Sequence, residues 1–159
     1  MKILGIDPGF ERLGIAILKK NKGDQKEAVL HSECFKTSSK LEFSERLHLI
    51  GEKIRTVVEE HNPDVLAIET LFLTTNHKTV MHVAEARGVV LYEAMRGGLR
   101  LFEASPPQIK VAVAGHGGAD KQQVMKMVRM LVHIPAGKDS DDELDAIAIA
   151  LTAFAHLKA

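Results

Sequence analysis

The chain contains one cysteine and no tryptophan among its 159 residues. A single cysteine, Cys34, excludes an internal disulfide and a zinc site made of several thiolates, and it is typical of a reducing compartment, so we expect a cytoplasmic protein. No apolar run approaches the roughly 20 residues of a membrane-spanning helix, so we expect neither export nor anchoring. Net charge is also absent, because 21 basic residues balance 21 acidic ones. Overall charge therefore gives no indication of a polyanionic partner.

The composition is that of a globular protein, with 45% hydrophobic and 26% charged residues. This length can bury one substantial core but leaves no room for a second, so we expect a single α/β domain over residues 1–159. Charge is segregated along the chain. Residues 105–138 carry five basic residues and one acid, whereas residues 139–145 carry five acids and no base. A basic surface beside an acidic one is the expected result.

The hydrophobic periodicity predicts the element order β-β-β-α-β-α-β followed by helices. The predicted strands are 2–6, 13–18, 28–35, 65–68 and 99–104, and the predicted helices are 41–61, 76–95, 106–114, 120–132 and one that begins near residue 140. The order indicates a five-stranded mixed sheet flanked by helices. From 144 to 157 the last helix is rich in Ala, Ile and Leu with almost no charge, so we expect it to lie flat against the sheet.

Four acids stand next to apolar core segments, where a lone carboxylate is costly: Asp7, Glu69, Asp142 and Asp145. An ionised carboxylate in such a place needs a cation, hydrogen bonds or a raised pKa. Asp7 and Glu69 each follow a predicted strand, so their side chains can meet at one rim of the sheet. Several such acids together predict a divalent-metal site.

Each acid also has a structural interpretation. The tripeptide Asp7-Pro8-Gly9 is a good turn signal by itself. The acids at 139–143 fall near a helix N-terminus, where they offset the macrodipole and cap free amides. That explanation does not cover Asp145, which lies inside the apolar helix, and the i,i+3 spacing places Asp142 on the same face. Asp139 and Asp141 are less favoured alternatives.

Four motifs occur in one order along nearly the whole chain: Gly5-Ile6-Asp7-Pro8-Gly9, Ala67-Ile68-Glu69, Ala86-Arg87-Gly88-Val89, and Asp142-x-x-Asp145 followed by Ala146-Ile147-Ala148-Ile149-Ala150. In this combination the sequence resembles the RuvC family of Holliday-junction resolvases. The resemblance implies a ribonuclease H-like fold, a homodimer, and paired symmetric nicks in a four-way DNA junction during recombination and repair. It also implies the branch-migration proteins RuvA and RuvB as partners.

Under this resemblance Asp7, Glu69, Asp142 and Asp145 are both the catalytic residues and the metal ligands. The resemblance fixes the register through Asp145, and Asp142 then stands where some members carry His. Four carboxylates suit two hard cations, Mg²⁺ with Mn²⁺ as a substitute, because Mg²⁺ prefers oxygen ligands. A pair of such ions can activate water for attack on a phosphodiester and stabilise the leaving oxygen. We expect Asp7 to bridge the two ions.

DNA contacts are expected from basic residues beside the acids, since the carboxylates repel phosphate. Lys110 and Lys121 match basic positions of the family, and Lys121 is a candidate for the scissile phosphate, although most lysines are simply solvated. Lys126 and Arg129 follow at roughly helical spacing. In the family an aromatic residue at the position of Phe72 wedges into the junction, whereas the structural alternative is a core residue. Further candidate contacts are His116, Arg87 and Lys78.

Three other functions compete with this hypothesis. A nucleotide-binding protein that uses the Asp7-Pro8-Gly9 turn for phosphate would need a second domain and a second phosphate loop, and the sequence has neither. A junction-binding protein without catalysis is disfavoured because all four candidate ligands are acidic. Another ribonuclease H-like nuclease, acting on RNA/DNA hybrids or RNA ends, is disfavoured by Phe72 and by the motif that begins at Ala86.

Overall fold

The computed structural model describes residues 1–71, 77–134, 137 and 140–157. Five strands form one sheet in the order β3-β2-β1-β4-β5. Strand β1 pairs antiparallel with β2 and parallel with β4, β2 pairs antiparallel with β3, and β4 pairs parallel with β5. The strands are β1 (Lys2–Asp7), β2 (Arg12–Lys19), β3 (Ala28–Lys36), β4 (Val65–Glu69) and β5 (Arg100–Ala104). The expected mixed sheet is confirmed.

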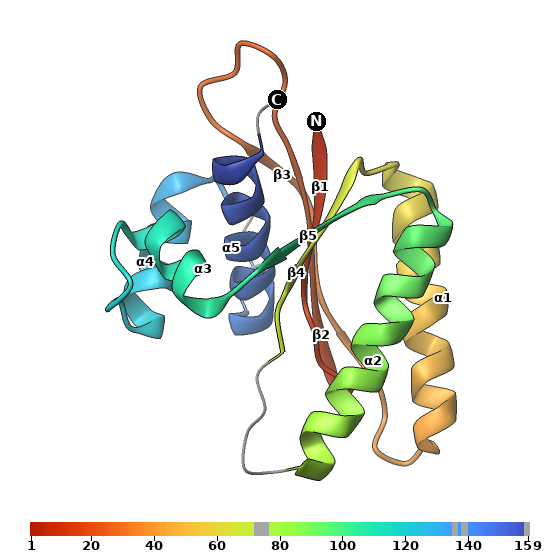
Figure 1. Ribbon diagram of the computed structural model, residues 1–159. Coiled ribbons are helices and arrows are strands. Elements are labelled where there is room, and N and C mark those ends of the chain that lie inside the picture. Colours follow the sequence, from red (N-terminus) through yellow and green to blue (C-terminus); the bar gives the residue numbers. More distant parts are fainter. Residues whose placement is uncertain (72–76, 135–136, 138–139, 158–159) are drawn as a thin grey trace.

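Helices cover both faces of this sheet (Figure 1). Two of them, α1 (Phe43–His61) and α2 (His77–Arg96), lie on one face. The other face carries α3 (Pro106–Ala114), α4 (Lys121–Leu131) and α5 (Asp141–His156). Within the described ranges, no helix is both long and apolar enough to cross a membrane.

The strand residues alternate between two separate hydrophobic cores. Along β1, Leu4 and Ile6 join the core under α1 and α2, whereas Ile3 joins the core under α5. Along β4, Leu66 and Ile68 follow the first pattern, and Val65 and Ala67 follow the second. Because both faces are buried, the strands read as continuous apolar runs in the sequence.

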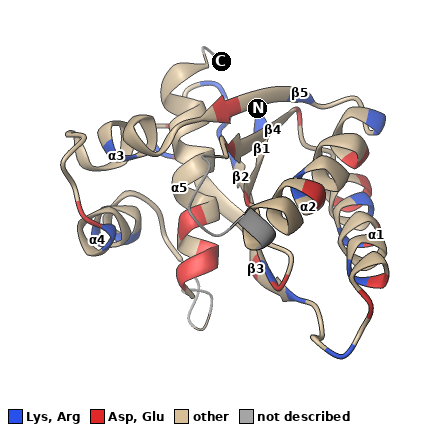
Figure 2. Cartoon of the chain, turned by 60° about the horizontal axis from the view of Figure 1, so that its bottom comes forward, with Lys and Arg blue, Asp and Glu red and all other residues tan. Residues whose placement is uncertain are grey.

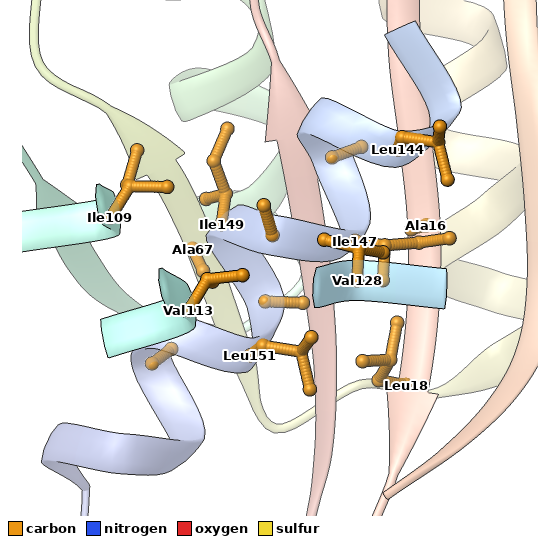
Figure 3. Packing of buried hydrophobic residues seen from close by; sticks show 14 of the residues in the cluster. Ala16, Leu18, Ala67, Ile109, Val113, Val128, Leu144, Ile147, Ile149 and Leu151 are labelled. Atoms are coloured by element: carbon orange, nitrogen blue, oxygen red, sulfur yellow. The ribbon is translucent and has the colours of Figure 1, made fainter. Parts of the chain in front are cut away.

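Helix α5 lies directly on the sheet, as its apolar sequence predicts (Figure 3). Small residues permit this close approach: a Cβ at Gly5 would lie 2.2 Å from the Ala146 carbonyl oxygen and 2.9 Å from the Ala150 Cβ. Glycine in the strand and alanine in the helix therefore bring the two backbones together. As a result, the first turns of α5 lie close to the end of β1.

The ends of the elements follow recognisable capping chemistry. Helix α1 begins at Phe43, two residues after the predicted start, because Glu42 and Glu45 form a capping box. Asp120 caps α4, with its carboxylate accepting a hydrogen bond from the Gln123 amide at 2.8 Å. Ser140 and Glu143 form the capping box of α5. The predicted start of α2 at Asn76 lies outside the described residues.

Candidate active site

Strand register places Asp7 beside Glu69. The parallel pairing of β1 with β4 matches Ile6 to Ile68, and each acid is the next residue of its strand. Since side chains alternate between faces, both carboxylates belong to the face that α5 covers. The carboxyl ends of two adjacent parallel strands thus bring two acids to one rim, as the sequence predicts.

Helix α5 brings Asp142 and Asp145 to the same rim. Figure 2 shows the acidic residues of its first turns. The approach depends on Gly14, which pairs with Asp7 across β1 and β2. A Cβ at Gly14 would lie 2.1 Å from the Asp142 carbonyl oxygen and 3.1 Å from the Asp7 Cβ. Only a residue without a side chain leaves room for the helix at this point.

The electrostatics of this rim are those of crowded carboxylates. Burial, followed by the negative charges of Asp145, Glu69 and Asp142, raises the pKa of Asp7 from 3.8 to about 7. Burial and the charge of Asp145 likewise raise the pKa of Glu69. Such shifts mark a site with more negative charge than its surroundings neutralise. A bound cation would relieve that excess.

Asp142 differs from its neighbours because Arg12 neutralises it. Arg12 donates to Asp142 Oδ2 from Nε at 2.8 Å and also from Nη2. The Cys34 thiol donates to the same oxygen at 3.4 Å. Although burial opposes the shift, these hydrogen bonds lower the pKa of Asp142. Burial and the neighbouring Asp142 raise the pKa of the Cys34 thiol, which favours the protonated form that donates to Asp142.

Lys121 is a second basic residue in contact with the cluster, on the side of Asp145. Its Nζ lies 3.1 Å from Asp145 Oδ2 and 3.4 Å from Asp141 Oδ2. Burial raises the pKa of Asp145 despite this partner. A pocket of about 200 Å³ lies here, and its lining includes Glu69, Asp145, Lys121 and Lys110. Lys110 and Lys121, the basic residues that match family positions, therefore share one pocket with Glu69 and Asp145.

The donor set has the right chemistry for hard divalent cations, because the four acids provide only oxygen atoms. The raised pKa values of Asp7 and Glu69 also indicate a site that gains from positive charge. Among the described residues, however, no three His, Cys, Asp or Glu side chains are gathered closely enough to hold an ion as they stand. Asp142 and Asp145 are engaged by Arg12 and Lys121, so rearrangement must precede shared coordination. The ligand assignment stays a prediction.

The remaining predicted DNA contacts lie in different places. Lys126 is exposed on α4 and does not line the pocket of the acids. Arg129 lines a second pocket, of about 500 Å³, whose wall includes 26–29 and 130–133. Phe72 lies outside the described residues. All three assignments stay predictions.

Two residues near the acids have structural roles: Glu143 caps α5, as expected for an acid near the helix N-terminus, whereas the role of Arg87 was not expected from the sequence. Glu143 is buried and accepts hydrogen bonds from Ser140 Oγ at 2.7 Å and from Ser32 Oγ at 3.0 Å, so this acid of the cluster is a cap that also joins α5 to β3. Arg87, considered above as a DNA contact, donates from Nε to the Glu69 carbonyl oxygen at 3.3 Å and pairs with Glu103. Arg87 therefore holds the backbone of a candidate ligand. Asp139 lies outside the described residues.

Arg12, Cys34 and Gly14 were also missed by the sequence analysis. Arg12 and Gly14 are two residues apart on β2, and Gly14 pairs with Cys34 of β3. The period of two within a strand was the available signal, since it places Arg12 on the same face as Gly14 and hence toward Asp7. Without the strand pairing, nothing in the sequence joins Arg12 to Asp142, 130 positions away.

Comparisons with known proteins agree on one family. The family model described as crossover junction endodeoxyribonuclease RuvC matches residues 3–153. A RuvC of Thermosipho melanesiensis is 41% identical over 150 residues, which are 94% of each chain. A RuvC of Halothermothrix orenii is 39% identical over 151 residues, covering 95% of this chain and 90% of that one. The structure of Thermus thermophilus RuvC in complex with a Holliday junction substrate matches with a TM-score of 0.89 at 34% identity, over 97% of this chain and 93% of that chain.

Proposed function

The chain belongs to the RuvC family of crossover junction endodeoxyribonucleases, and from that premise we propose that it resolves four-way DNA junctions by paired symmetric nicks. It is an endodeoxyribonuclease, and its substrate is the Holliday junction formed in recombination and repair. Acting on DNA, it works in the cytoplasm. RuvA and RuvB are proposed as partners on family grounds alone.

One observation carries the proposal most strongly: the carboxylates of Asp7 and Glu69 meet at one rim, and a helix packed within contact distance of the sheet brings Asp142 and Asp145 there. The raised pKa of Asp7 supports mutual proximity of the four charges.

We assign the four acids as ligands of two Mg²⁺ ions, with Mn²⁺ as a substitute. When bound, the ions supply an activated water and stabilise the leaving 3′ oxygen. Asp7 is given the central role because the charges of all three other acids raise its pKa. Lys121 offsets the charge of Asp145 and offers a cation to the approaching phosphate. Lys110, which lines the same pocket, adds a second positive charge that attracts the phosphate backbone of the DNA.

The test is cleavage of a four-way junction beside a linear duplex of the same sequence, each with Mg²⁺ and with EDTA. Incisions are mapped on all four strands of the junction. The proposal predicts nicks at symmetric positions on two opposing strands, none in the duplex, and none with EDTA. Equal cutting of the duplex, or cutting that persists in EDTA, would contradict it.

We also propose that the protein acts as a homodimer. Three large apolar side chains are exposed on α2: Met81 at 61%, Tyr92 at 65% and Met95 at 44%. Their spacing of 11 and 3 residues places them along one stripe of the helix, and Gly88, with open space at its Cβ position, lies on the same stripe. An apolar stripe of this kind suits self-association about a two-fold axis.

The dimer hypothesis is tested by Tyr92→Glu. A charge in the middle of the stripe should convert the dimer to a monomer in sedimentation analysis, while Glu85→Gln, on the same helix, should leave it dimeric. A Tyr92→Glu protein that sediments as the wild-type dimer would contradict the assignment of this surface.

A further inference from the structure

Arg12 joins β2 to α5 at the edge of the carboxylate cluster. Both of its contacting nitrogens, Nε and Nη2, donate to one oxygen, Oδ2 of Asp142. The Cys34 thiol donates to that oxygen as well. Three donors therefore converge on a single carboxylate oxygen, and two of them belong to the Arg12 guanidinium, whose positive charge opposes that of Asp142 directly.

We propose that Arg12 competes with a divalent cation for Asp142 and thereby sets the cation concentration at which the active site fills. This inference rests on the proposed function, because it takes Asp142 as a cation ligand. A guanidinium group and a metal ion are both stabilised by carboxylate oxygen. An ion that binds Oδ2 must displace the hydrogen bonds that Arg12 now makes there.

Exposure makes this exchange feasible. The Arg12 side chain is 50% exposed, and that of Asp142 is 19% exposed. The Arg12 guanidinium can therefore leave Asp142 and be solvated by water, without the large free-energy cost of leaving a buried charge unpaired. Asp142, by contrast, stays within the cluster because its backbone is packed against Gly14. The guanidinium is the partner that can leave.

The opposite role for Arg12 would be to hold the Asp142 carboxylate ready for the ion. That role requires the ligands to be gathered while Arg12 is in place. Within the described part of the chain, no three potential ligand side chains are gathered for an ion. Because three hydrogen bonds already converge on Oδ2 of Asp142, an ion at that oxygen has to displace a donor, which favours competition over positioning.

Divalent-cation binding without DNA tests this directly, with free Mn²⁺ measured by electron paramagnetic resonance. Arg12→Gln removes the charge and the guanidinium, and Arg12→Lys keeps the charge. The matched control is Lys36→Gln, since Lys36 is exposed and lies opposite Arg12 in the pairing of β2 with β3. This substitution removes one positive charge from the same edge of the site. Circular dichroism establishes that each variant is folded.

Competition predicts that Arg12→Gln binds Mn²⁺ about fivefold more tightly than wild type, the modest effect expected for a partly exposed ion pair. Arg12→Lys should lie between Arg12→Gln and wild type, and Lys36→Gln should change the affinity by less than about twofold, since its charge is screened by water. Such a pattern would show that the Mn²⁺ affinity depends on the contact between Arg12 and Asp142, and not on the total positive charge at this edge of the sheet.

Weaker or unchanged Mn²⁺ binding by Arg12→Gln would overturn the proposal, and so would an equal gain in Lys36→Gln. These outcomes leave a functioning cation site in the wild type, so the proposed function survives them. Absence of Mn²⁺ binding in wild type and in every variant would instead remove the metal site, and with it both the proposed chemistry and the role of Arg12.

Discussion

Replacement of Gly14 by alanine tests whether the packing of α5 sets the geometry of the carboxylates. The new Cβ would lie 2.1 Å from the Asp142 carbonyl oxygen and 2.8 Å from its carbonyl carbon. Contacts under 3.0 Å are essentially never made by real Cβ atoms. The backbones must therefore separate by about 0.9 Å at this point, since neither neighbour is a flexible side chain.

Two magnitudes follow from that displacement. Overpacking of a well-packed interface costs about 1–3 kcal/mol of unfolding free energy, which corresponds to a loss of roughly 2–12 °C in Tm for a chain of this size. A shift of about 1 Å at a catalytic group can reduce the rate about a hundredfold. We expect both effects, with Asp142 moved away from Asp7.

The assay is single-turnover cleavage of a four-way junction at a temperature where the variant is folded, together with thermal unfolding. Ile54→Val is the control for a loss of stability away from the acids, because Ile54 is fully buried in the core on the opposite face of the sheet and this change typically costs about 0.5–1.5 kcal/mol. Ile54→Val should cut at nearly the wild-type rate. A folded Gly14→Ala protein that cuts as fast as Ile54→Val would show that the packing of α5 on Gly14 does not set the geometry of the acids.

Three further predictions concern single side chains. The folded pKa of Asp7, about 7, exceeds its ordinary 3.8, so without divalent ions stability falls as pH rises from about 4 to 7. Asp7→Asn should therefore be roughly 2–4 kcal/mol more stable than wild type at pH 8, and equally stable near pH 4, in urea unfolding; parallel pH profiles would contradict this. Lys121→Met should slow junction cleavage about 10- to 100-fold and, in binding titrations, reduce the salt dependence by about one phosphate contact, with exposed Lys40→Met unchanged; equal salt slopes would argue against phosphate contact. Phe72→Ala should slow cutting of an intact junction more than of a pre-opened one, and equal losses would favour a core role.

The periodicity of the sequence was sufficient to predict the order and approximate limits of the elements. Strands that are buried on both faces appear in the sequence as apolar runs, whereas the helices show separate apolar stripes. A residue such as Asn62, which caps α1 in the left-handed conformation, marks where a helix ends. The ends were less predictable. Helix α1 starts at Phe43 because a capping box of two glutamates, Glu42 and Glu45, competes with the preceding Leu41 as a start signal.

The candidate acids were predictable because each stands beside an apolar segment, but their partners were not. Arg12 contacts Asp142 only because β2 pairs with β1 and α5 crosses both. Sequence distance hides such a pair. Lys121 was predicted as a phosphate contact, and the structure adds its ion pairs with Asp145 and Asp141, which come from the packing of α4 against α5.

The most direct test of the central claim, that the acids at this rim perform the cleavage, compares binding and cutting of a four-way junction by wild type and Asp7→Asn. The variant keeps the shape of the side chain and removes its charge. We expect Asp7→Asn to show wild-type junction affinity in Ca²⁺, a native circular dichroism spectrum, and no nicks in Mg²⁺ or Mn²⁺. A folded Asp7→Asn protein that still makes paired nicks at the wild-type rate would contradict it.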